Sequence, residues 1–334
     1  MDKVPTIDKK MLAELDLNPR ISTTLLAKKL RISQQLATYH LSNLLKRHII
    51  TNVGAVINYH LLGFQQYRIL AAFSELRDEQ KKYLFDFLSN HHSVYWAASI
   101  GADWDFIIVI ITPDYFGLTS FLTTLQDTFK GYIRSYTILR VLYQEFHHHK
   151  YLHPTDYPHP LIIDSRSKRP SELLKSLDIT DYHILHILKN NARTPFLEIG
   201  RISHVNYKTV QYRIKKMEKL HVIAGYRLFF KSTELGHRAY QLILSLSNYT
   251  NPVIEDLLGY VRYDPLVTQV LITLGRGDIY LHLRAKNLEE IQRTIIKLRN
   301  TFTIIQGINV TPIFEDILID HFPMSGILGK KTHT

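Results

Sequence analysis

The feature that most constrains this chain is an internal repeat at an offset of 173 residues, as from Leu12 to Leu185. The register holds without a gap from residue 8 to residue 129. Identities at this offset include Leu15 with Leu188, Arg20 with Arg193, Tyr39 with Tyr212, Lys46 with Lys219, His48 with His221, Asp105 with Asp278 and Phe129 with Phe302. A fixed register over this length predicts one two-part module that is used twice.

The first part of each copy contains three short predicted helices. Asp8, Ser22 and Ser33 stand where helix N-caps are expected, and Asn206 replaces Ser33 in the second copy. The third helix has apolar positions spaced i, i+4 and i+7, namely Ala37, Leu41 and Leu44, and then Val210, Ile214 and Met217. A β-rich stretch follows at 49–58 and at 222–230. Three helices followed by a strand pair predict a winged helix-turn-helix unit in each copy.

The second part of each copy alternates strand and helix. In copy one the predicted strands are 67–73, 94–99, 106–112 and 135–146, with helices at 78–88 and 116–129. In copy two the strands are 239–246, 267–274, 279–285 and 308–318, with helices at 252–263 and 288–298. A βαββαβ order predicts a ferredoxin-like sandwich with an antiparallel sheet.

The predicted fold class is therefore α+β, with two copies of a winged helix-turn-helix followed by a ferredoxin-like domain. The helix-turn-helix units are expected at 1–57 and 178–232, and the ferredoxin-like domains at 58–150 and 233–324. A proline-rich linker is expected at 151–177 and a tail at 325–334.

Short phrases in the two copies carry a family resemblance. Asp181–Arg193 reads D-x-x-I-L-x-x-L-x-x-N-A-R, and Thr209–Glu218 reads T-V-x-x-R-I-x-x-M-E. A Leu-Gly pair stands at 62–63 and 235–236, and a Gly-x-x-Asp turn at Gly275–Asp278. In this order the phrases resemble the Lrp/AsnC family of transcriptional regulators. The resemblance implies a RAM-type regulatory domain after each head, double-stranded DNA as the partner, and a small effector such as an amino acid.

The net charge of +11 is unevenly distributed along the chain. Residues 1–57 carry 9 Lys+Arg against 4 Asp+Glu, and residues 178–232 carry 10 against 4. The segments 58–146 and 233–324 are slightly acidic, with 7 against 9 and 8 against 10. This distribution favours a polyanion bound at the helix-turn-helix units, by phosphate contacts whose strength falls steeply with salt.

The third helix of each unit is expected to enter the major groove of DNA. In copy two, Arg213 stands where the family pattern has arginine, whereas copy one has His40, so the second unit is expected to be the stronger DNA binder. For any single candidate, a solvated polar surface is an equally good interpretation. The candidates are Ser33, Gln34, Gln35, Thr38, Tyr39, His40, Ser42 and Lys46 in copy one, and Asn206, Tyr207, Lys208, Gln211, Tyr212, Arg213, Lys215, Lys216 and Lys219 in copy two.

The resemblance also suggests an effector site at the Gly-x-x-Asp turns. Glycine lets backbone N–H groups approach a carboxylate, and aspartate can hold an ammonium group. A tight turn between two central strands is the simpler interpretation, and copy one has an extra residue before its second aspartate. The candidates are Gly101, Asp103, Trp104 and Asp105, and Gly275, Gly277 and Asp278.

The repeat and a run of histidines give two further expectations, on assembly and on metal binding. Because family members work as dimers, the tandem chain is expected to form an internal pseudo-dimer, with further homo-oligomers through the regulatory domains left open. The run His147–His149, with His153 and His159, is expected to be a solvated strand end. Neighbouring residues of a strand point to opposite faces, so the run cannot bind one metal ion with all three rings.

Several classes of protein are disfavoured by what the sequence lacks. With no cysteine there is no thiolate nucleophile and no cysteine zinc site. No apolar run reaches the roughly 20 residues of a membrane helix, and the N-terminus does not read as a secretion signal. The expectation is a cytoplasmic protein with no cofactor, no membrane partner and no enzymatic activity.

Two alternatives stay open at this point. Sirohaem decarboxylases have the same doubled architecture and use histidines and arginines around a tetrapyrrole, but the corresponding stretch here, 94–99, has neither. A module that binds only protein partners is the other alternative, and the positive charge of the helix-turn-helix units argues against it.

Overall fold

The structure is a computed structural model that describes residues 4–153, 159–166, 176–247, 249–275 and 278–319. The predicted tail 325–334 lies outside these residues. Copy one contains α1 (Thr6–Leu17), α2 (Thr23–Leu30), α3 (Gln34–Lys46), β1 (Ile50–Ile57), β2 (Gln65–Phe73), α4 (Asp78–Asn90), β3 (Val94–Ile100), β4 (Phe106–Thr112), α5 (Tyr115–Thr128) and β5 (Ile133–Phe146).

The linker and copy two follow in the same order. The linker contains the short helix η1 (Lys150–Leu152) and β6 (Leu161–Asp164). Copy two contains α7 (Ile179–Asn190), α8 (Phe196–Ile202), α9 (Tyr207–Lys219), β7 (Ile223–Phe230), η2 (Ser232–Leu235), β8 (Arg238–Leu246), α10 (Asn251–Val261), β9 (Val267–Leu274), β10 (Ile279–Ala285), α11 (Leu288–Thr301) and β11 (Ile305–Ile319). The predicted α+β fold class is confirmed.

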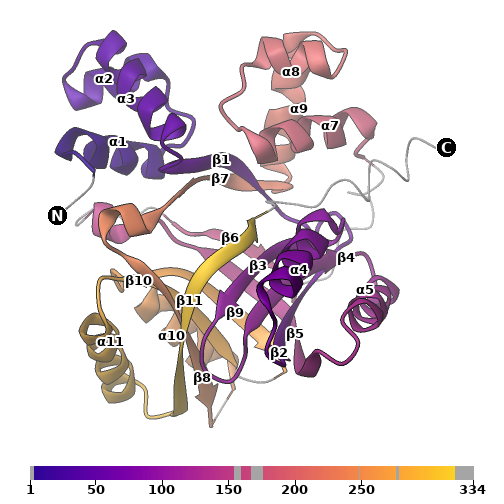
Figure 1. The fold of residues 1–334 in the computed structure, drawn as a ribbon. Helices are drawn as coiled ribbons and strands as arrows, with labels where there is room; N and C mark the ends of the chain where they lie inside the picture. Colours follow the sequence, from indigo (N-terminus) through magenta and orange to yellow (C-terminus); the bar gives the residue numbers. More distant parts are fainter. Residues whose placement is uncertain (1–3, 154–158, 167–175, 248, 276–277, 320–334) are drawn as a thin grey trace.

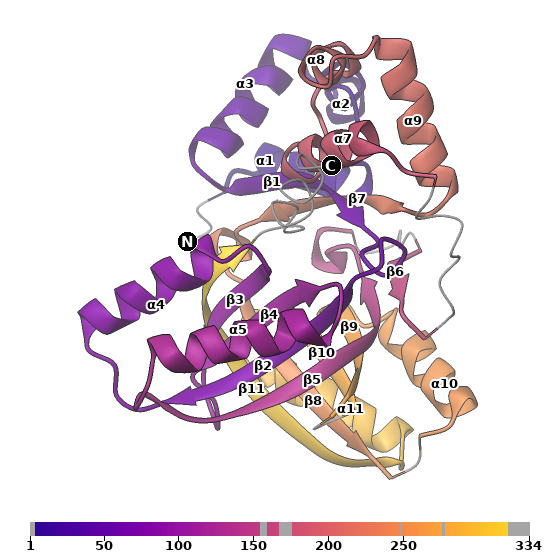
Figure 2. The same cartoon turned by 90° about the vertical axis from the view of Figure 1, so that its right-hand side faces the viewer.

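The two ferredoxin-like sheets join into one closed barrel. Their strands run in the order β2-β4-β3-β11-β8-β10-β9-β5, and β5 pairs back onto β2. Copy one meets copy two at β3–β11 and at β5–β9, both antiparallel. Helices α4 and α5 cover one side of the barrel and α10 and α11 the other (Figures 1 and 2). This is the arrangement expected of an internal pseudo-dimer.

A two-stranded ribbon links the barrel to the two helical heads. β1 and β7 pair antiparallel, so the strand pair expected inside each unit forms between the two units instead. We call α1–α3 head one and α7–α9 head two; both stand on the side of the ribbon away from the barrel (Figure 1). Each core crosses between copies: Val56 of β1 packs with α7, and Leu228 of β7 packs with α1. The ribbon is therefore part of both heads.

Gly54 shows how closely the ribbon approaches head two. A Cβ atom at this position would lie 2.6 Å from the carbonyl oxygen of Lys189 in α7. The Asn52 side chain donates a hydrogen bond of 2.9 Å to the same oxygen. Only glycine allows this contact without a shift of the backbone.

Two local expectations from the sequence are wrong. Asp8 does not cap α1, because Pro5 occupies the N-cap and Asp8 is buried in the first turn. The histidine run is not a solvated strand end: His147 and His149 are buried, against Glu145 and Asp16 respectively. His147 also donates its backbone N–H to Thr268 of β9, and His149 packs onto head one, and local sequence reveals neither contact.

Candidate DNA-binding heads and the barrel-mouth cavity

The third helix of each head begins at a side-chain cap and exposes a polar face. Ser33 Oγ accepts a hydrogen bond from the Leu36 N–H, and Asn206 Oδ1 accepts one of 2.9 Å from the Thr209 N–H. The most exposed aromatic side chain of these helices is Tyr212, at 69%. Among the predicted DNA-contacting residues, the exposed ones are Ser33, Gln34, Gln35, Thr38, Tyr39, Lys46, Asn206, Tyr207, Lys208, Tyr212, Lys215 and Lys219. Ser42, Gln211 and Lys216 are half-buried.

Arg213 and His40 are bound within their own heads. Arg213 Nη1 donates to both carboxylate oxygens of Asp178 at 2.8 Å and to Asp181 at 3.0 Å. The equivalent pair in head one joins His40 Nδ1 to Asp8 at 2.6 Å. Both pairs fasten the third helix to the first. The contacts of Arg213 suit a positioning role, and its predicted contact with DNA stays a prediction.

The aspartates of the predicted effector turns have the same structural role in both copies. Asp105 Oδ2 accepts a hydrogen bond of 2.7 Å from the Phe73 N–H, and Asp278 Oδ2 accepts one of 2.7 Å from Leu246. Each carboxylate thus fixes the turn to the neighbouring strand, as the turn interpretation requires. Asp103 and Trp104 border a small cavity of about 110 Å³, Gly101 packs against Phe314, Gly275 has a positive φ, and Gly277 lies outside the described residues.

A second candidate site lies where the barrel meets the ribbon. A cavity of about 130 Å³ is lined by β1 and β7 on the ribbon side and by β2, β5, β9 and β10 on the barrel side. Both copies therefore contribute to it, as do Trp96 of β3 and His149 of the linker. The mouth of a barrel is a common place for a ligand site. We call this space the barrel-mouth cavity.

Arg68 is the buried cation at the floor of the barrel-mouth cavity, with only 2% of its surface exposed. Its Nη2 donates 2.7 Å to Gln241 Oε1, and its Nη1 lies 3.3 Å from His282 Nε2. Within the described part of the chain, the Arg68 Nε has no hydrogen-bond partner. Burial lowers the pKa of Arg68 to about 10, so the side chain is charged at neutral pH. A buried charge with a spare donor is costly unless something pairs with it.

Two more arginines make the cavity cationic. Arg227 and Arg284 also line it, whereas Asp316 supplies one carboxylate, which accepts a hydrogen bond from Trp96 Nε1. Arg227 Nε likewise has no partner among the described residues, and burial lowers the pKa of Arg227 to about 10. Burial, followed by the charge of Arg68, holds the pKa of His282 well below its usual range. The lining therefore has two more positive than negative charges, which favours an anion such as a carboxylate.

The cavity touches head one through a histidine. His149 lines the cavity, and its Nδ1 lies 2.8 Å from Asp16 Oδ1 in α1. The His149 backbone N–H also donates 2.7 Å to Asp16 Oδ2. Although burial alone would raise it, His149 and His148 hold the pKa of Asp16 far below its usual range. The Asp16 carboxylate is therefore ionised, and it fixes the orientation of the His149 ring.

Comparisons with known proteins identify the heads. The AsnC-type helix-turn-helix domain matches residues 177–218, and a winged helix-turn-helix DNA-binding domain matches residues 5–51. The regulator LysM of Saccharolobus solfataricus is 31% identical over 140 residues, which span 42% of this chain and 95% of LysM. AldR of Mycolicibacterium smegmatis is 24% identical over 144 residues, 43% of this chain and 84% of AldR.

The chain belongs to the Lrp/AsnC family.

Solved structures of a sirohaem decarboxylase match this Lrp/AsnC chain along nearly its whole length. The sirohaem decarboxylase NirDL in complex with an iron-uroporphyrin III analogue has a TM-score of 0.61 and 11% identity, and the match covers 98% of each chain. The likeness shows that the doubled fold is shared. It also overturns the expectation of no enzymatic activity as a conclusion from this architecture, because NirDL, which shares the doubled fold, is an enzyme.

From the sequence, only the stretch 94–99 was compared with a tetrapyrrole site. The other residues that line the barrel-mouth cavity of this Lrp/AsnC chain were therefore not predicted. Of that stretch Tyr95 and Trp96 do line the cavity, but the basic side chains come from β2, β7, β10 and the linker. A signal for them exists. His282 and Arg284 alternate in the otherwise apolar strand I-Y-L-H-L-R-A, and Arg68 interrupts another apolar strand. Charged residues in buried strands are rare unless they bind something.

Within the described residues, no helix of the chain is both long enough and apolar enough to cross a bilayer.

Proposed function

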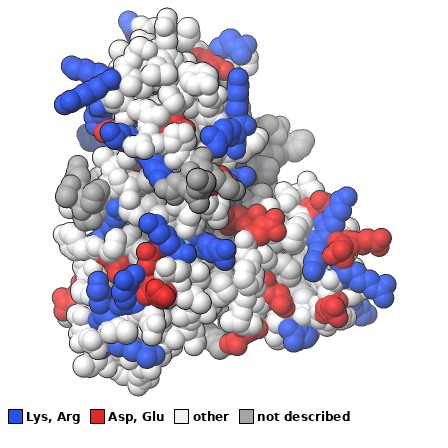
Figure 3. All heavy atoms as spheres, turned by 60° about the vertical axis from the view of Figure 1, so that its left-hand side comes forward, with Lys and Arg blue, Asp and Glu red and all other residues white. Residues whose placement is uncertain are grey.

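We propose that this chain is a cytoplasmic transcriptional regulator that binds double-stranded DNA with two unequal heads. The observation that carries the proposal is the pair of exposed polar faces on α3 and α9, in heads that match DNA-binding helix-turn-helix models. Figure 3 supports it: Lys and Arg gather over the upper part of the molecule, whereas acidic and basic side chains mix over the lower part.

The head with the more cationic third helix is head two. Exposed Lys208, Lys215 and Lys219 lie on α9, whereas α3 offers Lys46 and a row of neutral polar side chains. Lysine suits phosphate and guanine, and glutamine suits adenine. We therefore expect head two to supply most of the affinity, and the two heads to prefer different half-sites. The effector turns are left out of the proposal, because their aspartates hold the backbone.

The test is a salt titration of the full chain on random duplex DNA, followed by fluorescence anisotropy. A linear fall of log K with the logarithm of the salt concentration, with a slope that implies several phosphate contacts, supports the proposal. Absence of binding at low salt would refute it.

A second candidate function is a decarboxylase that acts on a carboxylate-rich tetrapyrrole. The barrel-mouth cavity favours it, because three arginines suit carboxylates and His149 is oriented by Asp16. Loss of CO₂ leaves an electron pair on carbon that must take up a proton. Burial lowers the pKa of His149, so the ring would first have to take up a proton from solvent, with Asp16 as the counter-ion, and then deliver it to the carbon. The volume of about 130 Å³ opposes it, because ligand pockets usually have about 300–1,000 Å³.

The test of the second candidate is to add sirohaem to the purified chain and follow its absorbance and the CO₂ released. A shifted spectrum with CO₂ release, both lost in Arg227→Gln, supports a decarboxylase. An unchanged spectrum at micromolar sirohaem excludes this substrate.

A further inference from the structure

The roof of the barrel-mouth cavity is the ribbon that carries both heads. Thr51 of β1 and Arg227 to Phe230 of β7 line the cavity from above. The same strands also pack into the heads, since Val56 of β1 belongs to the core of head two and Leu228 of β7 belongs to the core of head one. A rigid ligand larger than about 130 Å³ therefore enters only if the ribbon moves, and the heads move with it.

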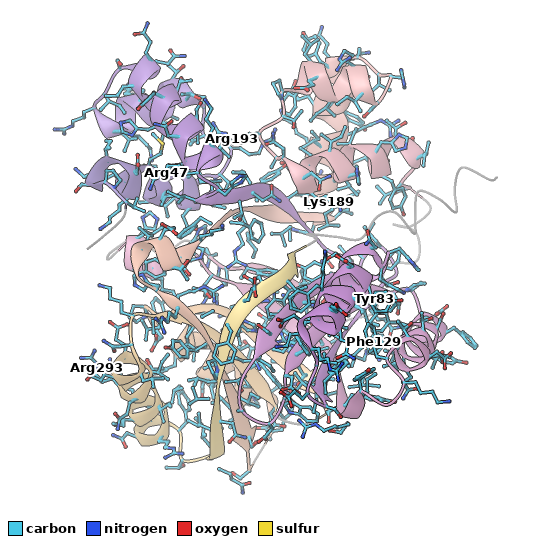
Figure 4. The ribbon with its side chains drawn as sticks, viewed as in Figure 1. Arg47, Tyr83, Phe129, Lys189, Arg193 and Arg293 are labelled. Carbon is cyan, nitrogen blue, oxygen red and sulfur yellow. The ribbon has the colours of Figure 1, made fainter. Side chains whose placement is uncertain are left out.

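The heads are also connected to each other across the pseudo-dimer. Arg193 of head two donates 2.9 Å to the Pro19 carbonyl of head one, and Arg20 donates 2.9 Å to the Tyr226 hydroxyl of β7. Figure 4 shows Arg193 between the two heads, above the ribbon. A shift of the ribbon therefore changes the placement of one head relative to the other, and two half-sites of a duplex require a fixed spacing.

Contact between the cavity and the heads is not symmetric. Head one has Asp16, bound to the cavity residue His149. The equivalent position of head two is Lys189, a cation where head one has a carboxylate. Its carbonyl binds Asn52 of the ribbon instead. An anion beside His149 competes with Asp16 for the same imidazole, so this route from the cavity leads to head one.

We propose that a rigid polycarboxylate in the barrel-mouth cavity is an effector that weakens DNA binding by head one, through Arg227, His149 and Asp16. The inference rests on the proposed DNA-binding function. The ligand class follows from the buried arginines with spare donors, and the direction follows from displacement of one head from its half-site. Occupancy of the cavity would leave head two as the main DNA contact.

The experiment uses the full chain, a duplex with a far-red label, and uroporphyrin III as the probe, since it carries clustered carboxylates on a rigid ring. Salt titrations are recorded with and without probe, and probe binding is followed separately by its absorbance. The expected result is a salt slope that falls by less than half when the probe is bound, because only the phosphate contacts of head one, the weaker head, are lost. Citrate, which is smaller, is expected to leave the slope unchanged.

The test variants are Asp16→Asn and His149→Gln, and the matched control is Asp8→Asn. Asp8 is also a buried carboxylate of α1 bound to a histidine, but its partner His40 lies inside the head. The ratio of the salt slope with probe to the salt slope without probe is expected to be one in both test variants. In the control it is expected to stay below one, as in the unmodified chain. A probe that competes directly for the lysines of the heads would act equally on all three variants and overturn the proposal.

Two other results separate the failure of this inference from the failure of the proposed function. Absence of DNA binding without probe refutes the proposed function itself. Normal DNA binding without probe, together with a slope that the probe leaves unchanged, refutes the effector inference alone, whether or not the probe binds.

Discussion

Arg20 and Arg193 occupy equivalent positions in the two copies, and each reaches across to the other copy. Arg193 donates to the Pro19 carbonyl, and Arg20 donates to the Tyr226 hydroxyl while its guanidinium lies 5.1 Å from the Phe196 ring centroid. One sequence phrase, used twice, thus joins the heads reciprocally. The partners of the two arginines differ, so the heads are joined from both sides but by unequal contacts.

Gly54→Ala is expected to destabilise the junction of ribbon and head two. The new methyl group would lie 2.6 Å from the Lys189 carbonyl oxygen, so the ribbon must shift. We expect a loss of about 1–3 kcal/mol, seen as a lower midpoint in thermal unfolding. The control is Gly259→Ala in α10, where a Cβ meets nothing within 4 Å; there the midpoint should stay or rise. Equal midpoints for the two variants would contradict the close contact.

Arg213→Ala is expected to act on stability rather than on phosphate binding. Its removal leaves the Asp181 carboxylate, only 2% exposed, without its cationic partner. Breaking such a pair costs about 3 kcal/mol, which denaturant unfolding can measure. At temperatures where the variant is folded, the salt slope of DNA binding should equal that of the unmodified chain. A slope reduced by one phosphate contact would instead place Arg213 on the DNA.

Acidification is expected to destabilise the barrel mouth. The pKa of His282 is lowered in the folded chain, so the unfolded chain binds more protons below the unfolded pKa of about 6.5. The free energy of unfolding should therefore fall as pH drops below about 6.5, by at most about 1.4 kcal/mol per pH unit for this group. His282→Gln should reduce the loss of thermal midpoint between pH 7.5 and pH 5.5, whereas exposed His183→Gln should not. Equal losses in both variants would show that His282 is not responsible.

Arg227→Gln is expected to weaken uroporphyrin binding by about tenfold or more, because a charge-assisted contact contributes about 1.5–3 kcal/mol. Binding is measured by titration of the probe absorbance. Arg293→Gln, on α11 at the outer side of the barrel, is the charge-matched control (Figure 4). If both variants lower the affinity equally, the effect is one of net charge and not of the cavity.

Most of the fold could be predicted because each segment shows a regular pattern. The strands Phe106–Thr112 and Val267–Leu274 have the predicted bounds, since runs rich in apolar and β-branched residues favour a strand. The closed barrel could not be predicted in the same way. It depends on pairing of β3 with β11 and of β5 with β9, whose residues are far apart in the sequence and carry no local signal.

In the candidate sites too, some residues could be predicted from local sequence and others depend on tertiary contacts. The caps Ser33 and Asn206 were predictable because capping is local. The roles of Arg213 and the cavity residues were not, because they depend on tertiary partners. Asp181 binds Arg213 from a different helix, and Arg68 meets His282 from the other copy. Polar residues that interrupt the apolar strands β2 and β10 were the local clue to the cavity.

The central claim is that the chain binds DNA mainly through the exposed lysines of α9, the third helix of head two. The direct measurement is the salt slope of duplex binding for Lys208→Ala/Lys215→Ala compared with Arg293→Ala/Lys297→Ala, a pair of equal charge on α11 of the barrel. We expect the Lys208→Ala/Lys215→Ala pair to reduce the salt slope by about two phosphate contacts and to weaken binding. The α11 pair is expected to change neither the slope nor the affinity. Equal effects of the two pairs would contradict it.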